Sequence, residues 1–114
     1  MASRARPLAS SRRRSTRSRE KEDNENVKWT FLTNHLHVLL FLYRRPDQRL
    51  RDIAVAVGIT ERMVQRIVVE LVEAGYLKIL KEGRRNHYIV NSRLRLRHPL
   101  EMHHTVGELI KILD

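Results

Sequence analysis

Apolar residues recur at helical spacing in the middle of the chain. The first such stretch predicts a helix that begins near Thr33 and Asn34, either of which can cap its first turn, and that stops before Pro46. Its core-facing stripe follows i, i+4, i+7, i+8 and i+11: Leu32, Leu36, Leu39, Leu40 and Tyr43. Other faces of the same helix are apolar too: Val38, Phe41 and Leu42. Such a helix needs more than one neighbour to cover it, and in a short chain a second subunit could be one of them.

Two more helices follow and meet at a tight turn. The first is predicted over residues 51–57, after a short strand at residues 48–50, with Ile53, Ala54 and Val57 facing inward. Gly58 supplies the backbone freedom that ends this helix. The second is predicted over residues 60–74, with Thr60 as its N-cap. Its buried face recurs at i, i+3, i+4 and i+7: Val64, Ile67, Val68 and Leu71.

A hairpin and a last helix complete the pattern. Residues 76–81 and 87–90 predict two antiparallel strands joined by a loop at 82–86, with Leu77 and Ile79 facing Tyr88 and Val90. Residues 93–97 alternate arginine with leucine, which predicts an extended segment with an arginine edge. A final helix is predicted from Pro99 onward, with this apolar stripe: Met102, Val106, Leu109, Ile110 and Leu113. The order predicts an α+β fold with a three-helix core, a β-hairpin and a C-terminal helix.

Charge adds a partner class to this picture. The chain carries 23 Lys+Arg against 13 Asp+Glu, a formal net charge of +10, which suits a polyanion and nucleic acid first. Residues 1–26 hold eight of the basic and four of the acidic side chains, so residues 27–114 are still net +6. We expect residues 1–26 to be a disordered, Arg-rich tail, because they offer almost no large aliphatic side chains to bury. This tail is either a basic arm that adds phosphate contacts or a solvated leader.

Several function classes lack the residues they need. The 114-residue chain has no cysteine, which excludes disulfides and thiolate metal sites and fits a reducing cytosol. No apolar run approaches the roughly 18 residues of a membrane span. No phosphate loop, nucleophile motif or carboxylate pair is present, so we expect no catalysis and no cofactor. His35 with His37, and His103 with His104, are spaced poorly for one ion, and we expect no metal site.

The helix predicted over residues 60–74 begins with side chains that suit the edges of base pairs. Arginine can make two hydrogen bonds to guanine, and glutamine two to adenine, so Arg62, Gln65 and Arg66 are expected to read bases in the major groove. Thr60 and the amides of the helix start suit phosphate. Glu61 would repel phosphate unless it accepts from a cytosine amine or orients a neighbouring arginine. The alternative is that this polar face is only hydrated.

The hairpin tip provides a second contact. Arg84 and Arg85 can enter a narrow minor groove, and Lys81 and His87 flank them near phosphates. An ordinary charged turn is the alternative. The full set of residues predicted to bind DNA is Arg51, Thr60, Glu61, Arg62, Gln65, Arg66, Lys81, Arg84, Arg85, Asn86 and His87.

These blocks resemble small bacterial winged helix-turn-helix transcriptional regulators of the MarR and ArsR kind. The resemblance covers residues 27–114 and rests on WTFLTN (29–34), GITERMVQRIVVELVEAGYL (58–77), GRRNHYIVN (83–91), and RHPLE and HHTVGELI within residues 97–110. It implies a homodimer held by the terminal helices, with one recognition helix for each half-site. The positions that would then read DNA are Arg62, Gln65, Arg66, Arg84 and Arg85. The expected dimer interface is Leu36, Val38, Phe41, Leu42, Met102, Val106, Leu109, Ile110 and Leu113.

The resulting hypothesis is a cytoplasmic, nucleoid-associated bacterial regulator that binds specific duplex DNA as a homodimer. Helix 60–74 would enter the major groove, and the wing at residues 81–87 would contact backbone or minor groove. No small-molecule effector is assigned. Two alternatives stay open: a basic protein that binds nucleoid DNA or RNA without sequence preference, and a winged helix that docks another protein.

Overall fold

The computed structural model describes residues 28–114. The tail expected at residues 1–26 lies outside them. The described residues fall into two units, 28–31 and 32–114, which are treated separately. In the first, the rings of Trp29 and Phe31 meet edge to face with their centroids 5.1 Å apart.

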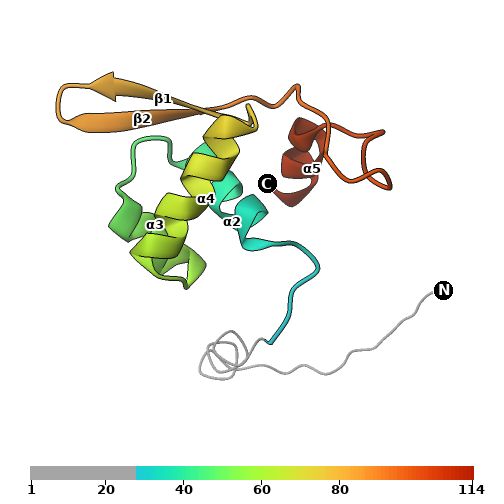
Figure 1. The fold of residues 1–114 in the computed structure, drawn as a ribbon, viewed down its shortest axis with the longest axis horizontal. Coiled ribbons are helices and arrows are strands. Elements are labelled where there is room, and N and C mark those ends of the chain that lie inside the picture. Colours follow the sequence, from blue (N-terminus) through green and yellow to red (C-terminus); the bar gives the residue numbers. More distant parts are fainter. Residues whose placement is uncertain (1–27) are drawn as a thin grey trace. The chain divides into compact units, whose positions relative to one another are not determined.

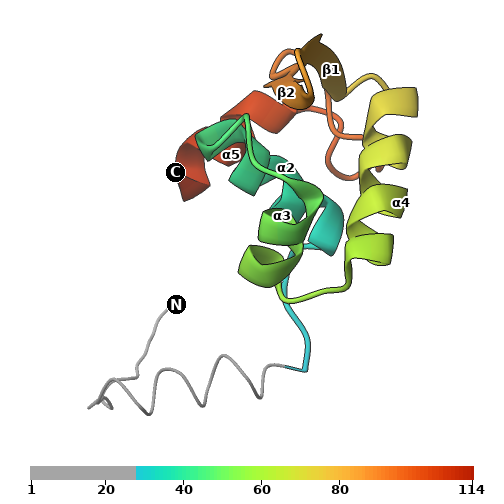
Figure 2. The same ribbon diagram turned by 90° about the vertical axis from the view of Figure 1, so that its left-hand side faces the viewer.

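The second unit contains every described helix and strand (Figure 1). In chain order they are α2 (Asn34–Arg44), α3 (Leu50–Val57), α4 (Glu61–Glu73), β1 (Leu77–Glu82), β2 (Arg85–Val90) and α5 (Val106–Leu113). Helices α2, α3 and α4 pack against one another, and the hairpin begins where α4 ends (Figures 1 and 2). This is the predicted three-helix core with its hairpin and C-terminal helix. Within residues 28–114, no helix is both long and apolar enough to cross a membrane.

Helix α2 lies at the centre of the core and begins where predicted, with Thr33 as N-cap. Neither of the two predicted caps acts through its side chain. The buried residues are Leu36, Val38, Leu39 and Leu42. Tyr43, expected in the core, is exposed and Leu40 is only half-buried, because α3, α4 and β2 cover a different arc of the helix.

The helix-turn-helix follows the sequence pattern closely. Residues 48–49 are not a strand, and Leu50 is already the first residue of α3. Ile53 and Ala54 are buried, and Gly58 ends the helix in the left-handed conformation at φ 86°, which glycine adopts at little cost. Thr60 caps α4, since its side-chain oxygen accepts from the Met63 backbone N–H at 3.1 Å. All four predicted inward residues of α4 are buried: Val64, Ile67, Val68 and Leu71.

The hairpin has the predicted register but a shorter tip. Leu77 pairs with Val90 and Ile79 with Tyr88, so these side chains share one face. The loop expected at residues 82–86 is only the turn at Gly83 and Arg84, because Glu82 pairs with Arg85 and extends both strands. At its base, the Tyr88 N–H donates to the Pro46 carbonyl at 2.7 Å, which joins β2 to the α2–α3 connection.

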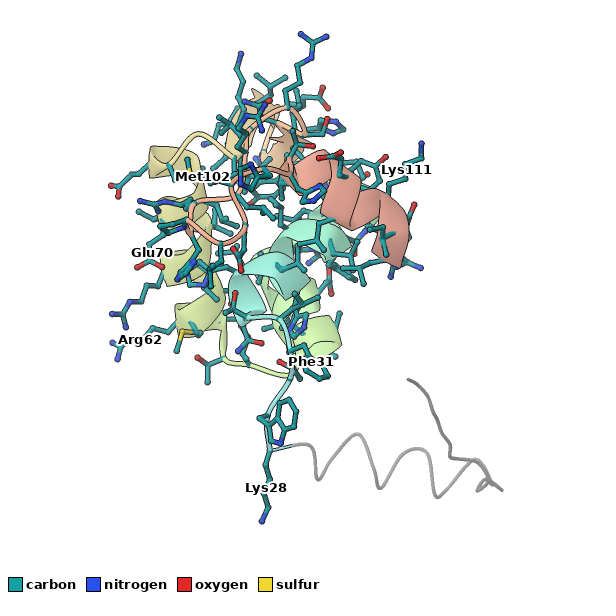
Figure 3. The ribbon with its side chains drawn as sticks, turned by 90° about the vertical axis from the view of Figure 1, so that its right-hand side faces the viewer. Lys28, Phe31, Arg62, Glu70, Met102 and Lys111 are labelled. Atoms are coloured by element: carbon teal, nitrogen blue, oxygen red, sulfur yellow. The ribbon has the colours of Figure 1, made fainter. Side chains whose placement is uncertain are left out.

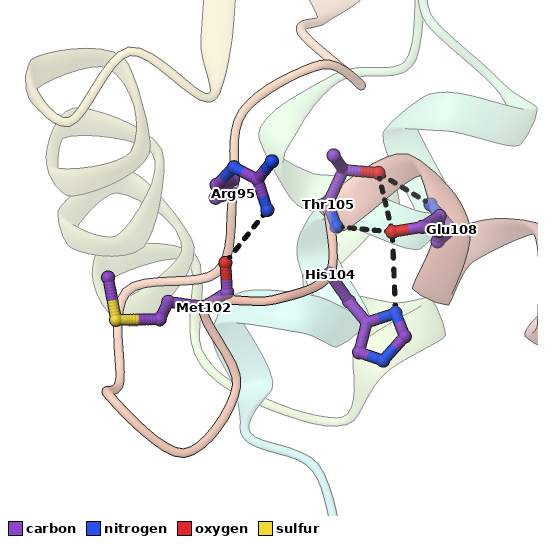
Figure 4. A network of polar contacts seen from close by, with 5 residues as sticks. All are labelled: Arg95, Met102, His104, Thr105 and Glu108. Atoms are coloured by element: carbon purple, nitrogen blue, oxygen red, sulfur yellow. Dashed lines mark hydrogen bonds and ion pairs between the residues drawn. The ribbon is translucent and has the colours of Figure 1, made fainter.

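The C-terminal segment is where the sequence prediction fails most. Residues 98–104 form turns rather than the first turns of a helix, and α5 begins at Val106. The start is set by a capping box, in which the Thr105 side chain accepts from the Glu108 N–H at 3.2 Å and the Glu108 carboxylate accepts from the Thr105 N–H at 2.7 Å (Figure 4). This Thr-x-x-Glu spacing is a stronger start signal than a proline alone.

Two contacts seat α5 on the rest of the unit. The Gly107 N–H donates to the Ser92 carbonyl at 3.0 Å, and a Cβ at residue 107 would lie 2.6 Å from that oxygen. At the other end, the Arg44 Nε donates to Asp114 at 2.8 Å and the Arg44 guanidinium also donates to the Leu113 carbonyl. The ends of α2 and α5 therefore lie side by side, and Val106 and Ile110 belong to the common core.

Candidate nucleic-acid interface

The exposed face of α4 carries the predicted reading residues. Arg62, Gln65 and Arg66 are all exposed, while the opposite face of the helix is packed into the core. Thr60 and Glu61 are exposed at the helix start. Figure 3 shows Arg62 projecting away from the core on the same side of α4 as Glu70. Within residues 28–114, Glu61 makes no ion pair, so it does not orient either arginine in this structure.

A carboxylate that the sequence analysis did not single out lies beside Arg66, one of the residues predicted to contact bases. The Glu70 carboxylate is 3.9 Å from the Nε of Arg66, one helical turn away. Its other oxygen is 2.7 Å from the Nε2 of His35 on α2. A carboxylate only accepts hydrogen bonds, so His35 donates from Nε2. The i, i+4 spacing of Arg66 and Glu70 was visible in the sequence, but the contact to α2 joins residues 35 positions apart.

The wing presents its charges on both faces. Lys81, Arg84 and Arg85 are exposed, whereas Asn86 and His87 are half-buried. The Asn86 side-chain amide donates to the Tyr88 hydroxyl at 3.5 Å, so it already has a partner within the hairpin. Alternation along β2 places Arg85 and His87 on the face opposite Tyr88.

One further predicted contact lies on the first helix of the helix-turn-helix. Arg51 is exposed in the first turn of α3. The structure therefore gathers the helix-start residues on α4, keeps the arginines of the wing accessible, and leaves Arg51 on a separate helix.

The predicted dimer interface needs correction. Five of its nine residues lie in the core of the single chain and cannot also face a second subunit: Leu36, Val38, Leu42, Val106 and Ile110. Helical periodicity identified them as apolar but could not tell whether the same chain or another one covers them. The other four keep accessible surface: Phe41, Met102, Leu109 and Leu113.

Most of the histidines have partners within the chain. His37 Nδ1 lies 3.0 Å from the Asn34 side-chain oxygen, and His98 Nδ1 accepts from the Leu100 N–H. His104 Nδ1 is 3.4 Å from Glu108. The part of the chain from 28 to 114 has no group of three His, Cys, Asp or Glu side chains arranged to hold a metal ion.

The Glu108 carboxyl is the clearest perturbed acid of the described residues. The hydrogen bond from the Thr105 backbone N–H holds its pKa below the ordinary value, and His104 acts in the same direction. Glu108 belongs to the capping box of α5 and lies on a different helix from the residues predicted to contact bases.

Comparison with solved structures identifies the fold. The predicted DNA-binding transcriptional regulator from E. coli matches with a TM-score of 0.55 and 12% identity, over 84% of this chain and 90% of that one. MepR, the transcription regulator of the Staphylococcus aureus multidrug efflux pump MepA, matches with a TM-score of 0.50 and 15% identity, over 82% of this chain and 62% of MepR. No family model and no curated protein matches the sequence.

The likeness is one of fold, and the lengths differ. The PcaV transcriptional regulator from Streptomyces coelicolor has 22% identity and a TM-score of 0.47, over 60% of this chain and 51% of that one. The chain thus spans about half of PcaV and 62% of MepR. Residues 32–114 form a winged helix-turn-helix, with α3 and α4 as the helix-turn-helix and β1–β2 as the wing.

Proposed function

We propose that this chain is a transcriptional regulator that binds specific duplex DNA as a homodimer. One observation carries the proposal. Arg62, Gln65 and Arg66 stand exposed on the first half of α4, on a helix whose other face is locked into the core. Side chains on so rigid a support can be presented to base edges in one fixed register.

Each part of the interface has a distinct role in this proposal. Arginine and glutamine side chains on α4 hydrogen-bond to guanine and adenine in the major groove. Thr60 and the amides at the helix start bind phosphate, which sets the depth and direction of α4. Arg84 and Arg85 contact the backbone or the minor groove beside the site, where the potential attracts arginine.

The homodimer is proposed on the accessible apolar residues near α5. Of the four accessible residues of the predicted interface, Phe41 lies on α2 and Leu109 and Leu113 lie on α5, and Ile112 adds a side chain that is 80% exposed. Because Arg44 joins the ends of α2 and α5, these residues lie on adjoining helices. Two recognition helices related by a two-fold axis would read a palindromic site.

Selection of bound duplexes from a random pool tests the proposal with the full chain. We expect an enriched palindrome and preference for it over random duplex and structured RNA at physiological salt. Arg66→Ala should lose most of this preference, while Lys111→Ala, which removes one exposed positive charge from α5, should keep it. An unenriched pool, or equal binding to duplex and RNA, would overturn the proposal.

A further inference from the structure

The three-residue cluster of His35, Glu70 and Arg66 joins the recognition helix to α2. Both bonded side chains are about half exposed, at 48% for His35 and 47% for Glu70, and Arg66 is 72% exposed. The short contact is the one between helices, at 2.7 Å, and the long contact is the one along α4, at 3.9 Å. Glu70 is therefore anchored by α2 and only loosely paired with Arg66.

The negative charge of Glu70 would lower the affinity of α4 for DNA. A carboxylate on the exposed side of α4 repels the phosphates, and it does so whatever the base sequence is. Arg66 would otherwise be free to follow any nearby phosphate, since its guanidinium is long, flexible and exposed. A fixed carboxylate one turn away draws that guanidinium along the helix.

We infer that Glu70 is a specificity-determining residue, which His35 holds in place and which positions Arg66 for base contact. The inference rests on the proposed function and deepens it. Glu70 acts in two ways: it lowers the affinity for random duplex by repelling phosphate, and it favours an Arg66 conformation directed along α4 over one that follows the backbone. Selectivity, rather than total affinity, is the property that Glu70 increases.

The alternative is that Glu70 only joins α2 to α4. That role predicts loss of stability and a parallel loss of binding to all duplexes when the contact is removed. A specificity role predicts opposite changes, with tighter binding to random duplex and a smaller preference for the selected site. The sign of the change for random duplex separates the two.

The test uses the full chain, the selected palindrome and a random duplex of equal length, with binding measured by fluorescence anisotropy. Glu70→Gln keeps an oxygen that can accept from His35 but removes the charge that faces Arg66. Glu73→Gln is the matched control, because it removes the same charge from an exposed position on the same helix and has no ion pair within residues 28–114. His35→Ala keeps the charge of Glu70 and removes its anchor.

We expect both glutamine variants to bind random duplex up to about twofold tighter, and Glu70→Gln alone to lose selectivity, by about three- to fivefold. His35→Ala should lose part of the selectivity without the gain on random duplex. Thermal unfolding of each variant is measured alongside.

Three results would overturn the inference. Equal selectivity of Glu70→Gln and Glu73→Gln would reduce Glu70 to a general charge. Weaker binding of Glu70→Gln to every duplex would assign it the structural role. A wild-type chain that shows no preference at all would overturn the proposed function, and this inference with it, whereas the first two results leave that function standing.

Discussion

Helices α4 and α5 are both capped by a threonine at the N-terminus, but only α5 has a complete capping box. Each is capped by a threonine whose side chain accepts from the backbone N–H three residues on, at 3.1 Å from Met63 and 3.2 Å from Glu108. At α5 the third residue is a glutamate that returns a hydrogen bond to Thr105. At α4 it is Met63, which has no oxygen to return, and within residues 28–114 the Thr60 N–H has no such partner.

The two helices therefore differ in whether all the backbone N–H groups of the first turn have acceptors within the described residues. The amides in the first turn of a helix need acceptors, and these come from side chains, water or a ligand. The first turn of α5 is closed by its own carboxylate and by Ser92, and it lies against the core. The first turn of α4 is exposed and keeps donors available, as the proposed phosphate contact requires.

The largest expected effect comes from replacing the second helical residue of each helix by alanine. In Gly107→Ala the new Cβ would meet the Ser92 carbonyl at 2.6 Å, so the backbone must shift and the hydrogen bond from residue 107 is strained. We expect a loss of about 2–3 kcal/mol in the free energy of unfolding, measured with urea. Arg62→Ala, at the equivalent exposed position of α4, should change it by less than about 0.5 kcal/mol. Equal stabilities would mean that α5 is not seated against Ser92 as described.

A smaller effect is expected when each threonine cap is removed. Thr105→Ala should cost about 1–2 kcal/mol and Thr60→Ala about 0.5–1 kcal/mol, because only the first also loosens the partner carboxylate. Thermal unfolding of the two variants at one pH gives the comparison directly. If Thr60→Ala were the more destabilising, the open start of α4 would be contributing more to the fold than to binding.

The smallest expected effect is a pH dependence of the free energy of unfolding that comes from Glu108 in the capping box of α5. The folded chain holds the pKa of Glu108 below its ordinary value, so its ionised form favours folding. That contribution is present above the unfolded pKa and is lost as pH falls through the lowered folded pKa. Denaturant unfolding should therefore show the stability difference between wild type and Glu108→Gln shrinking from neutral pH to below about pH 4. A difference that stayed constant would contradict the capping role, and His104→Gln serves as the control for the neighbouring imidazole.

Local patterns in the sequence were enough to predict the helix-turn-helix and the hairpin register. Spacing alone selects Val64 and Leu71 as inward residues, and Gly58 and Thr60 mark the boundaries of their helices. Alternation constrains the wing register, because a one-residue slip would place Leu77 and Tyr88 on opposite faces of the hairpin.

The errors have a common physical cause, which is contact between distant parts of the chain. Pro99 is compatible with a helix start, but the capping box at Thr105 and the seat on Ser92 place the start later. Val38 and Ile110 are predicted at a dimer interface but lie in the core of the chain, because a one-dimensional pattern shows that a residue is apolar and not what covers it. The contact between His35 and Glu70 was missed because helical spacing relates residues within a helix, not between two.

The hydrogen bond between the Tyr88 N–H and the Pro46 carbonyl fixes the wing at its base and leaves its tip free to bend. This bond joins the base of the hairpin to the α2–α3 connection. Next to it, the Asn91 N–H donates to the Tyr76 carbonyl at 2.9 Å and extends the pairing of the two strands. From Tyr88 to the turn at Gly83, the pairing of β1 with β2 holds the hairpin together. Bending of the hairpin would therefore move the arginines at its tip most and the core least. In the proposed complex, the wing would then follow the contour of the duplex without changing the angle of α4.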